Sequence, residues 1–252
     1  DIHGYVSGDI RAEGPIDNLS WKSIGTRLED GGLRVDFTNV PYFVDGSFRF
    51  TDSGLYFDDI RGRDRYDGTA AITGGIKWNN KFQDIYYDIA IKCNELEGID
   101  LNDKQNEYFY GNVFGTGNVT FSGSENDMVM DVEGTTAKTG TFHVPVIYTS
   151  VSGRSNLLKF TEIKEEKPTD PYDVIMKKMD NSEETAVKFT TNMKINALPD
   201  VEAFIWIDKT SGHMLSGHGN GTIQMMVNED VFDITGDYNI TKGNYKFVAY
   251  GI

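Results

Sequence analysis

The chain has 252 residues, and its 38% apolar and 12% aromatic content with only six prolines is typical of a folded protein that buries a sizeable apolar surface. Its 39 acidic and 24 basic residues give a net charge of −15 without a basic cluster. This charge disfavours binding to nucleic acids and electrostatic docking on anionic membrane surfaces.

Taken in chain order, the dominant pattern is an alternation of apolar and polar residues with a period of two, which predicts β-strands. The strand-like runs are rich in Thr, Val, Ile, Tyr and Phe, and turn residues such as those of 51–54 separate them. The clearest runs are 48–60, 86–92, 117–123, 128–134, 201–208 and 243–250. An all-β fold is expected.

Glycine punctuates these runs, and 27 glycines occur in the chain. Glycine allows a strand to bend or bulge, so its repeated use predicts an elongated, strongly curved sheet in the form of a trough. The glycine-flanked runs are 4–14, 68–78, 111–123, 217–227 and 236–251. Their irregular spacing excludes a strict solenoid repeat.

One polar stretch, residues 162–184, breaks the strand pattern. It contains the best helical signal of the chain, 173–180, which follows Pro171 and carries Met176 and Met179 on one face. Because the pattern on both sides is the same, the stretch is interpreted as an insertion with a short helix in one elongated domain of residues 1–252. The alternative is a boundary between two β-domains.

The alternating runs place apolar side chains on one face of each strand, where they fill a closed sandwich core or line an open groove that prefers hydrocarbon. Strand 201–208 is ambiguous, because Phe204 and Trp206 make its other face apolar too. The groove candidates are Ile85, Tyr87, Ile89 and Ile91; Val119 and Phe121; Met128, Met130 and Val132; Met193 and Ile195; Ile205 and Ile207; and Ile223, Met225 and Val227.

Catalytic and metal-binding motifs are lacking in the sequence. The single cysteine, Cys93, permits neither an intrachain disulfide nor a cysteine-based metal site. His213 and His218 have no acidic residue between them at a ligand-like offset, and there is no EF-hand loop or nucleophile elbow. His143 is expected to be an ordinary surface or edge residue, and Asp64 a solvent-facing turn carboxylate. The sequence therefore predicts a protein without catalytic residues, cofactor or metal.

Two glycine–aromatic segments carry a family resemblance. The segment 106–123, which reads NEYFYGNVFGTGNVTFSG, resembles a signature segment of the TamB family in its Bacteroidetes-type branch. The segment 234–247, ITGDYNITKGNYKF, resembles a second signature of the same family, whose usual continuation is absent. The chain is accordingly identified as a fragment from the C-terminal region of a TamB/AsmA-like envelope protein.

The resemblance implies a U-shaped β-sheet with an apolar inner face, sometimes called a β-taco, in the bacterial periplasm. It also implies a parent protein anchored in the inner membrane and an outer-membrane barrel partner of the TamA/BamA kind. The implied function is non-enzymatic: holding acyl chains for phospholipid transport to the outer membrane, outer-membrane protein assembly, or both.

Two further hypotheses stay open at this stage. In one, the chain is a carbohydrate-binding or carbohydrate-active β-sandwich or β-helix, in which Trp21, Trp78 or Trp206 stacks on a sugar ring. In the other, it is a structural scaffold whose edge strands pair with a barrel partner through backbone hydrogen bonds.

Overall fold

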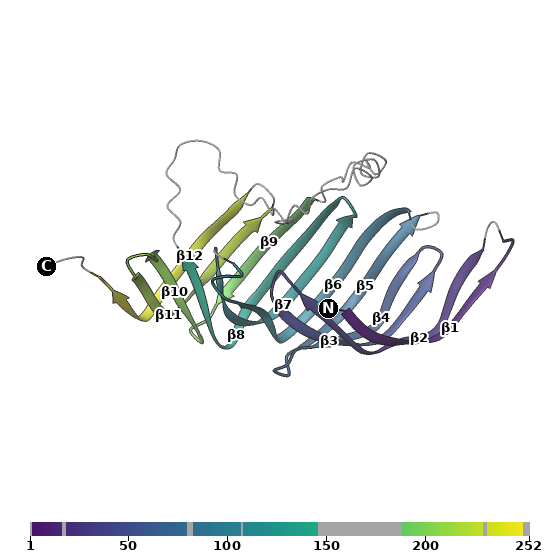
Figure 1. Cartoon of the computed structure of the whole chain (residues 1–252), viewed down its shortest axis with the longest axis horizontal. Helices are drawn as coiled ribbons and strands as arrows, with labels where there is room; N and C mark the ends of the chain where they lie inside the picture. Colours follow the sequence, from purple (N-terminus) through teal and green to yellow (C-terminus); the bar gives the residue numbers. More distant parts are fainter. Residues whose placement is uncertain are drawn as a thin grey trace, which may run out of the picture.

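The computed structural model describes residues 2–16, 19–79, 83–106, 108–145, 188–228 and 231–248. In these ranges the chain is all-β, as expected, and its twelve strands form one large sheet (Figure 1). The strands are β1 (Ile2–Glu13), β2 (Ser20–Val35), β3 (Val40–Thr51), β4 (Gly54–Arg63), β5 (Thr69–Asn79), β6 (Gln83–Leu101), β7 (Tyr110–Ser124), β8 (Asp127–Pro145), β9 (Lys188–Ala197), β10 (Val201–Asp208), β11 (His213–Val227) and β12 (Phe232–Lys246).

The described residues contain no helix, and so none that is long and apolar enough to cross a membrane. The short helix expected at 173–180, with the polar insertion 162–184 around it, lies outside the described residues. The predicted strand run 243–250 is shorter in the structure, because the last strand ends at Lys246. Residue 250 lies outside the described residues.

Strands β1 to β8 pair in chain order, each antiparallel to the next. The order then changes, because β8 pairs in parallel with β9 along its first half and with β10 along its second half. Strand β11 is antiparallel to both β9 and β10, and β12 follows it at the end of the sheet. Strands β9 and β10 therefore both lie between β8 and β11, one after the other, and residues 198–200 connect them.

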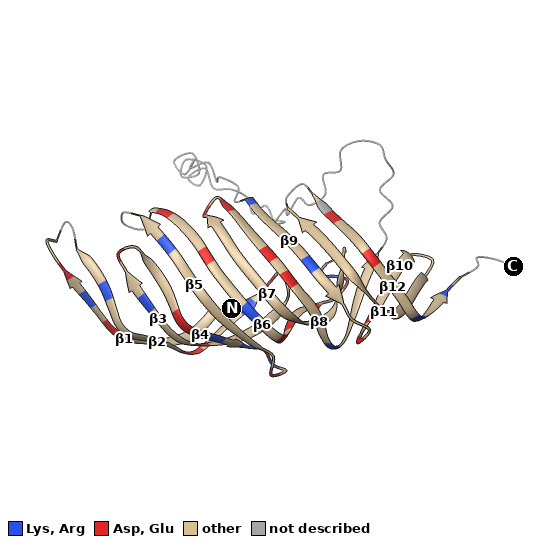
Figure 2. Cartoon of the chain, turned by 180° about the vertical axis from the view of Figure 1, so that it is seen from behind, with Lys and Arg blue, Asp and Glu red and all other residues tan. Residues whose placement is uncertain are grey.

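Burial alternates along the strands as the sequence pattern predicts. On β6, Ile85, Tyr87, Ile89 and Ile91 are half-buried, whereas the residues between them are exposed. Successive side chains of a strand point to opposite faces, so the sheet has a more apolar and a more polar face. Figure 2 shows acidic and basic residues distributed along the strands from the β1 end to the β12 end.

Register shifts interrupt most of the strand pairings, and several coincide with left-handed backbone conformations at Asp30, Glu95 and Gly46. At Gly46, with a φ of 142°, a Cβ would overlap the carbonyl oxygen of Asp59 on β4, so this position requires glycine. Each bulge bends its strand and increases the local twist. In Figure 1 strands β1 and β2 change direction about half-way along their length.

A small apolar core lies between parts of the sheet that are not neighbours. Leu101 at the end of β6, Phe109 just before β7 and Met225 on β11 form one buried cluster. In a flat sheet β6 and β11 would be four strand spacings, or about 19 Å, apart. Phe109, which comes from the connection between β6 and β7, completes the cluster between these distant strands.

Candidate apolar groove

A hollow of about 450 Å³ lies on the apolar face of the first seven strands. Every side chain that lines it is aliphatic or aromatic, so a ligand there would be held by burial of hydrocarbon and not by polar contacts. The lining residues are Val6, Leu28, Leu33, Val44, Phe48, Leu55, Phe57, Ile60, Ile72, Ile89, Ile91 and Phe121. This hollow is called the open groove below.

The open groove has a buried floor and an exposed rim. Val44 on β3 and Ile60 on β4 are buried, whereas Val6 on the edge strand β1 is 65% exposed. Every described residue of β1 is exposed, and Ile2 and Ile10 of the same strand are large exposed apolar side chains. The apolar face is thus accessible from the β1 side.

Three of the sequence-predicted groove residues, Ile89, Ile91 and Phe121, line the open groove. The other nine lining residues belong to the first five strands and were missed. One signal for them was available in the run 48–60, where Phe48, Leu55 and Phe57 follow the strand alternation.

Most of the remaining candidates continue the same face beyond the open groove. One row runs directly across five strands through Ile91, Val119, Val132, Met193 and Met225. A second row joins Ile89, Phe121 and Met130, and reaches Val227 through Thr191. Met193 and Met225 lie directly opposite each other in the first row, and Met130 belongs to the second row.

The other candidates are more dispersed. Ile195 and Ile223 lie directly opposite each other, and both Tyr87 and Met128 lie opposite Gly123. Ile85 lies two residues before Tyr87 on the same face of β6. On β10, Ile205 and Ile207 are half-buried and do not line the open groove. The structure therefore does not bring these two residues to it.

The part of the apolar face on β9, β11 and β12 is covered by the chain itself. Phe109, which is 4% exposed, and Leu101 occupy it, and Met193, Val227 and Ile234 are among the side chains that pack against this cluster. The apolar face is consequently open over the first seven strands and filled over the last ones.

A second, larger hollow of about 800 Å³ has mainly polar side chains around it. Four of the polar side chains around it pair with each other: Asn192 Nδ2 donates a hydrogen bond to Asp131 at 2.8 Å, and Lys194 Nζ lies 3.5 Å from the Glu133 carboxylate. Within the described ranges of the chain, no group of three or more His, Cys, Asp or Glu side chains is arranged to hold a metal ion.

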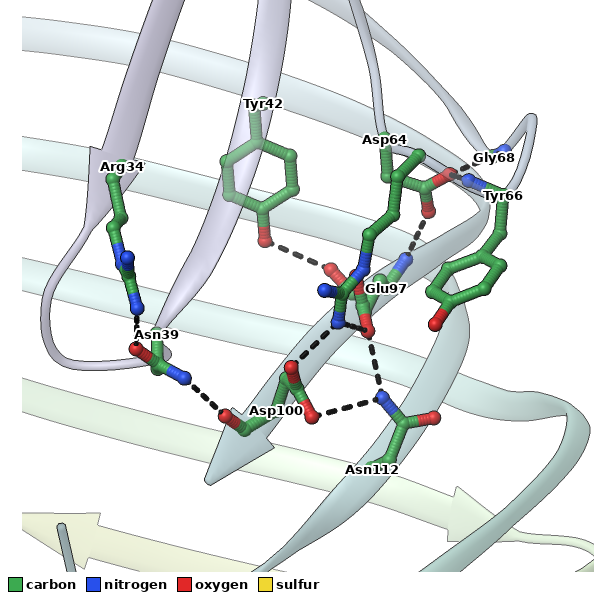
Figure 3. A network of polar contacts seen from close by, with 10 residues as sticks. Arg34, Asn39, Tyr42, Asp64, Tyr66, Gly68, Glu97, Asp100 and Asn112 are labelled. Carbon is green, nitrogen blue, oxygen red and sulfur yellow. Dashed lines mark hydrogen bonds and ion pairs between the residues drawn. The ribbon is translucent and has the colours of Figure 1, made fainter. Parts of the chain in front are cut away.

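A buried polar network lies where the β4–β5 hairpin ends (Figure 3). The carboxylate of Glu97 on β6 is fully buried and accepts hydrogen bonds from Arg65 Nη2 at 2.8 Å, Arg65 Nε at 3.1 Å and Asn112 Nδ2 at 2.6 Å. Arg65 also pairs with Asp100. Both oxygens of the Glu97 carboxylate are therefore bound by side chains of the protein.

The same network corrects the expectation for Asp64, which is buried instead of solvent-facing. Its carboxylate accepts backbone N–H groups of Tyr66 at 2.7 Å, Gly68 at 2.8 Å and Glu97 at 2.6 Å. Asp64 therefore fixes the β4–β5 turn and ties it to β6. The sequence gives no sign of this role, because the third contact comes from a residue 33 positions later.

Two strands that flank the β4–β5 hairpin meet beyond this turn. Tyr42 Oη on β3 donates to the Glu97 carbonyl oxygen at 2.8 Å, and burial raises the pKa of the Tyr42 phenol. In the β2–β3 turn, the Thr38 carbonyl accepts the backbone N–H of Asp100 at 2.9 Å, and Asn39 Nδ2 donates to the Asp100 carbonyl at 2.7 Å. These contacts fasten β3 to β6.

An aromatic stack corrects the expectation for His143, which is half-buried. Its ring lies between Tyr110 at 4.6 Å and Phe204 at 4.3 Å, both nearly parallel to it. Trp206 Nε1 donates to His143 Nδ1 at 3.2 Å. Burial lowers the pKa of the imidazole, which stays the neutral acceptor that this hydrogen bond needs.

The three tryptophans considered as sugar platforms are not equivalent. Trp206 packs in the aromatic stack, and the ring of Trp78 lies 5.4 Å from that of Phe50. Trp21 on β2 is the most accessible of the three. The rings of Trp206 and Trp78 are thus partly used by the fold.

The comparisons with known proteins bear on this combination of an amphipathic sheet and an apolar groove. The model of the TamB C-terminal domain matches residues 58–251, which is most of the chain. Searches of curated proteins and of solved structures found no match. The matched range begins in β4 and includes both glycine–aromatic segments that resemble the family. On this match the chain belongs to the TamB family.

Proposed function

We propose that the chain is a non-enzymatic segment of a cell-envelope protein that holds acyl chains on the apolar face of a trough-shaped sheet. The TamB family is a family of envelope proteins and is not a known enzyme family. The observation that carries the proposal is the open groove, in which side chains from seven consecutive strands leave a hollow with no polar lining residue.

The energetics of such a groove suit an acyl chain. Each methylene transferred from water to an apolar surface contributes about 0.8 kcal/mol. A groove without hydrogen-bonding groups adds little specificity for the headgroup, which would stay in water at the rim. This favours a holding site for several lipids over a receptor for one.

Two observations support the trough. Leu101 and Met225 belong to one buried cluster although their strands are not neighbours, and the Tyr42–Glu97 hydrogen bond joins β3 to β6. In the proposed setting the trough lies in the periplasm, within a parent protein anchored in the inner membrane. It serves phospholipid transport to the outer membrane, outer-membrane protein assembly, or both, with a barrel partner of the TamA/BamA kind.

The scaffold hypothesis is a second candidate, supported by the fully exposed edge strand β1. An exposed edge offers unpaired N–H and C=O groups to another strand. The two functions are compatible, because a strand added at β1 would extend the apolar face. Sugar binding has less support, since Trp206 and Trp78 already pack against rings of the chain.

A pair of neighbouring substitutions on β6 tests the acyl-chain proposal. Ile89→Glu puts a carboxylate into the open groove, whereas Ala90→Glu puts the same group on the opposite, exposed face of the same strand. Palmitate binding is measured by displacement of an apolar fluorescent dye, and native mass spectrometry of the purified protein records co-purified phospholipid.

We expect Ile89→Glu to weaken palmitate binding at least tenfold and Ala90→Glu to leave it within about twofold, since only the first desolvates a charge on binding. Circular dichroism must show that both variants are folded. Absence of palmitate binding and of co-purified lipid in the unaltered protein, or equal binding by the two variants, would refute the proposal.

A further inference from the structure

We propose that Phe109 is the stopper of the open groove, and that its ring sets the longest acyl chain the groove accommodates. This inference rests on the proposed function and adds a specificity-determining residue to it. The position is unusual, because Phe109 belongs to no strand: β6 ends at Leu101 and β7 begins at Tyr110. Its ring is placed by a connection and is not tied to the alternation of a strand.

The ring of Phe109 packs against residues that are far apart in the sequence. It lies 6.3 Å from Phe37 of the β2–β3 turn in an edge-on arrangement and 6.2 Å from Phe142 of β8. It also shares a buried cluster with Met225 of β11. At 4% exposed it is among the most buried large side chains of the described residues. A single ring therefore spans from an early turn to a late strand.

The connection holds this ring firmly in place. The Asn106 side-chain oxygen accepts the backbone N–H of Tyr108 at 2.9 Å and that of Phe109 at 3.2 Å. Earlier in the same connection, Gln105 donates its backbone N–H to the carbonyl oxygen of Asn102 at 3.1 Å. These contacts hold the backbone of Tyr108 and Phe109, and the ring of Phe109 itself is packed among the other aromatic and apolar side chains of the cluster.

The stopper stands close to the end of the open groove. The last strand that lines the groove is β7, through Phe121. Two residues away on the same face, Val119 lies opposite Val132, and Val132 lies opposite Met193, which packs against the Phe109 cluster. Two strand spacings of continuous apolar face thus separate the groove from the cluster. Among the described residues, the side chains of this cluster cover the methionine-bearing part of the face.

The test uses saturated fatty acids from decanoate to docosanoate as probes and measures the affinity of each by dye displacement. In the unaltered protein, affinity should rise about fourfold per added methylene and then level off at a limiting length. In Phe109→Ala the levelling-off should move to longer chains, because the face beyond the ring becomes available. Phe109→Leu should move it in the same direction by a smaller amount.

The control is Phe37→Ala, which removes a neighbouring ring that is 41% exposed and leaves Phe109 in place. It should keep the limiting length of the unaltered protein. An unchanged limiting length in Phe109→Ala overturns the stopper and leaves the groove function standing, and Phe109→Leu decides in the same way if the alanine variant does not fold. If no fatty acid binds the unaltered protein, the proposed function itself fails.

Discussion

The phenol of Tyr42 donates a hydrogen bond of 2.8 Å to the backbone carbonyl of Glu97 and so joins β3 to β6 across the end of the β4–β5 hairpin. Two strands lie between this pair in the sheet order, so a contact between them is possible only where the hairpin has ended. The contact places a long-range constraint at one side of the open groove, whose lining includes residues of all four strands.

Replacing Tyr42 by Phe should lower the free energy of unfolding by about 1 kcal/mol at neutral pH, because a buried carbonyl loses its partner while the ring stays. The denaturant midpoint measures this effect. The control is Tyr56→Phe, since the Tyr56 hydroxyl forms a hydrogen bond with the exposed Ser53 at 3.1 Å, and the loss of an exposed hydrogen bond should change the midpoint very little. Equal shifts in the two variants would contradict the importance of the Tyr42 contact.

The same variant has a defined pH dependence. Burial raises the pKa of Tyr42 above its ordinary value of 10.0, so above about pH 10 the unfolded chain releases this proton while the folded chain retains it. Stability contributed by Tyr42 is present below pH 10 and declines at higher pH. The midpoints of the unaltered protein and of Tyr42→Phe should therefore approach each other as the pH rises above 10.

Loss of the Arg65 charge should be far more damaging than loss of an exposed arginine. Arg65→Met leaves the fully buried carboxylate of Glu97 without its cation, which costs about 3–5 kcal/mol in comparable cases. Arg61→Met breaks only the exposed pair with Asp59 at 3.1 Å and should cost less than about 1 kcal/mol. Denaturant unfolding of both variants measures the difference, and similar midpoints would show that Glu97 is not held as described.

Local alternation in the sequence predicted the all-β class, part of the strands and, on β6, which side chains between Ile85 and Ile91 share a face. Alternation no longer predicts which residues are buried after Glu95, because the left-handed backbone of this residue forms a bulge. Beyond it both Leu96 and Glu97 are buried, although strict alternation would bury only one of two neighbours. A bulge of this kind leaves no clear mark in a sequence with many polar turns.

Long-range partners were the part of the site that sequence reasoning could not supply. Glu97 is one of 39 acidic residues, and only the fold shows that Arg65 and Asn112 converge on it. Phe109 and Met225 are more than a hundred residues apart, and no periodic pattern links them. The same reason explains the corrections at Asp64 and His143, whose burial comes from partners on other strands.

The filled part of the apolar face should behave as a core. Met225→Ala removes a side chain that is 8% exposed and should cost about 2–4 kcal/mol, through lost burial and the cavity left behind. Its neighbour Met226 is 40% exposed on the other face, and Met226→Ala should cost less than about 0.5 kcal/mol. Thermal and denaturant midpoints compare the two variants. A small effect at Met225 would mean that the cluster with Phe109 is loosely packed.

The aromatic stack around His143 should make the protein less stable in mild acid. Burial lowers the pKa of His143 below its ordinary value of 6.5, so as the pH falls the unfolded chain takes up a proton before the folded one. Stability contributed by this site is therefore present above about pH 6.5 and decreases at lower pH. Glu202 and Asp103 oppose the lowered pKa electrostatically, and Lys209 reinforces it.

His143→Phe keeps a ring between Tyr110 and Phe204 but cannot be protonated, and it gives up the hydrogen bond from Trp206. We expect a small loss of stability at pH 8 and a weaker decline between pH 7 and pH 5 than in the unaltered protein. His3→Gln on the exposed strand β1 should keep the original decline. Unfolding midpoints across this pH range decide the matter, and an undiminished decline in His143→Phe would assign the acid sensitivity to other groups.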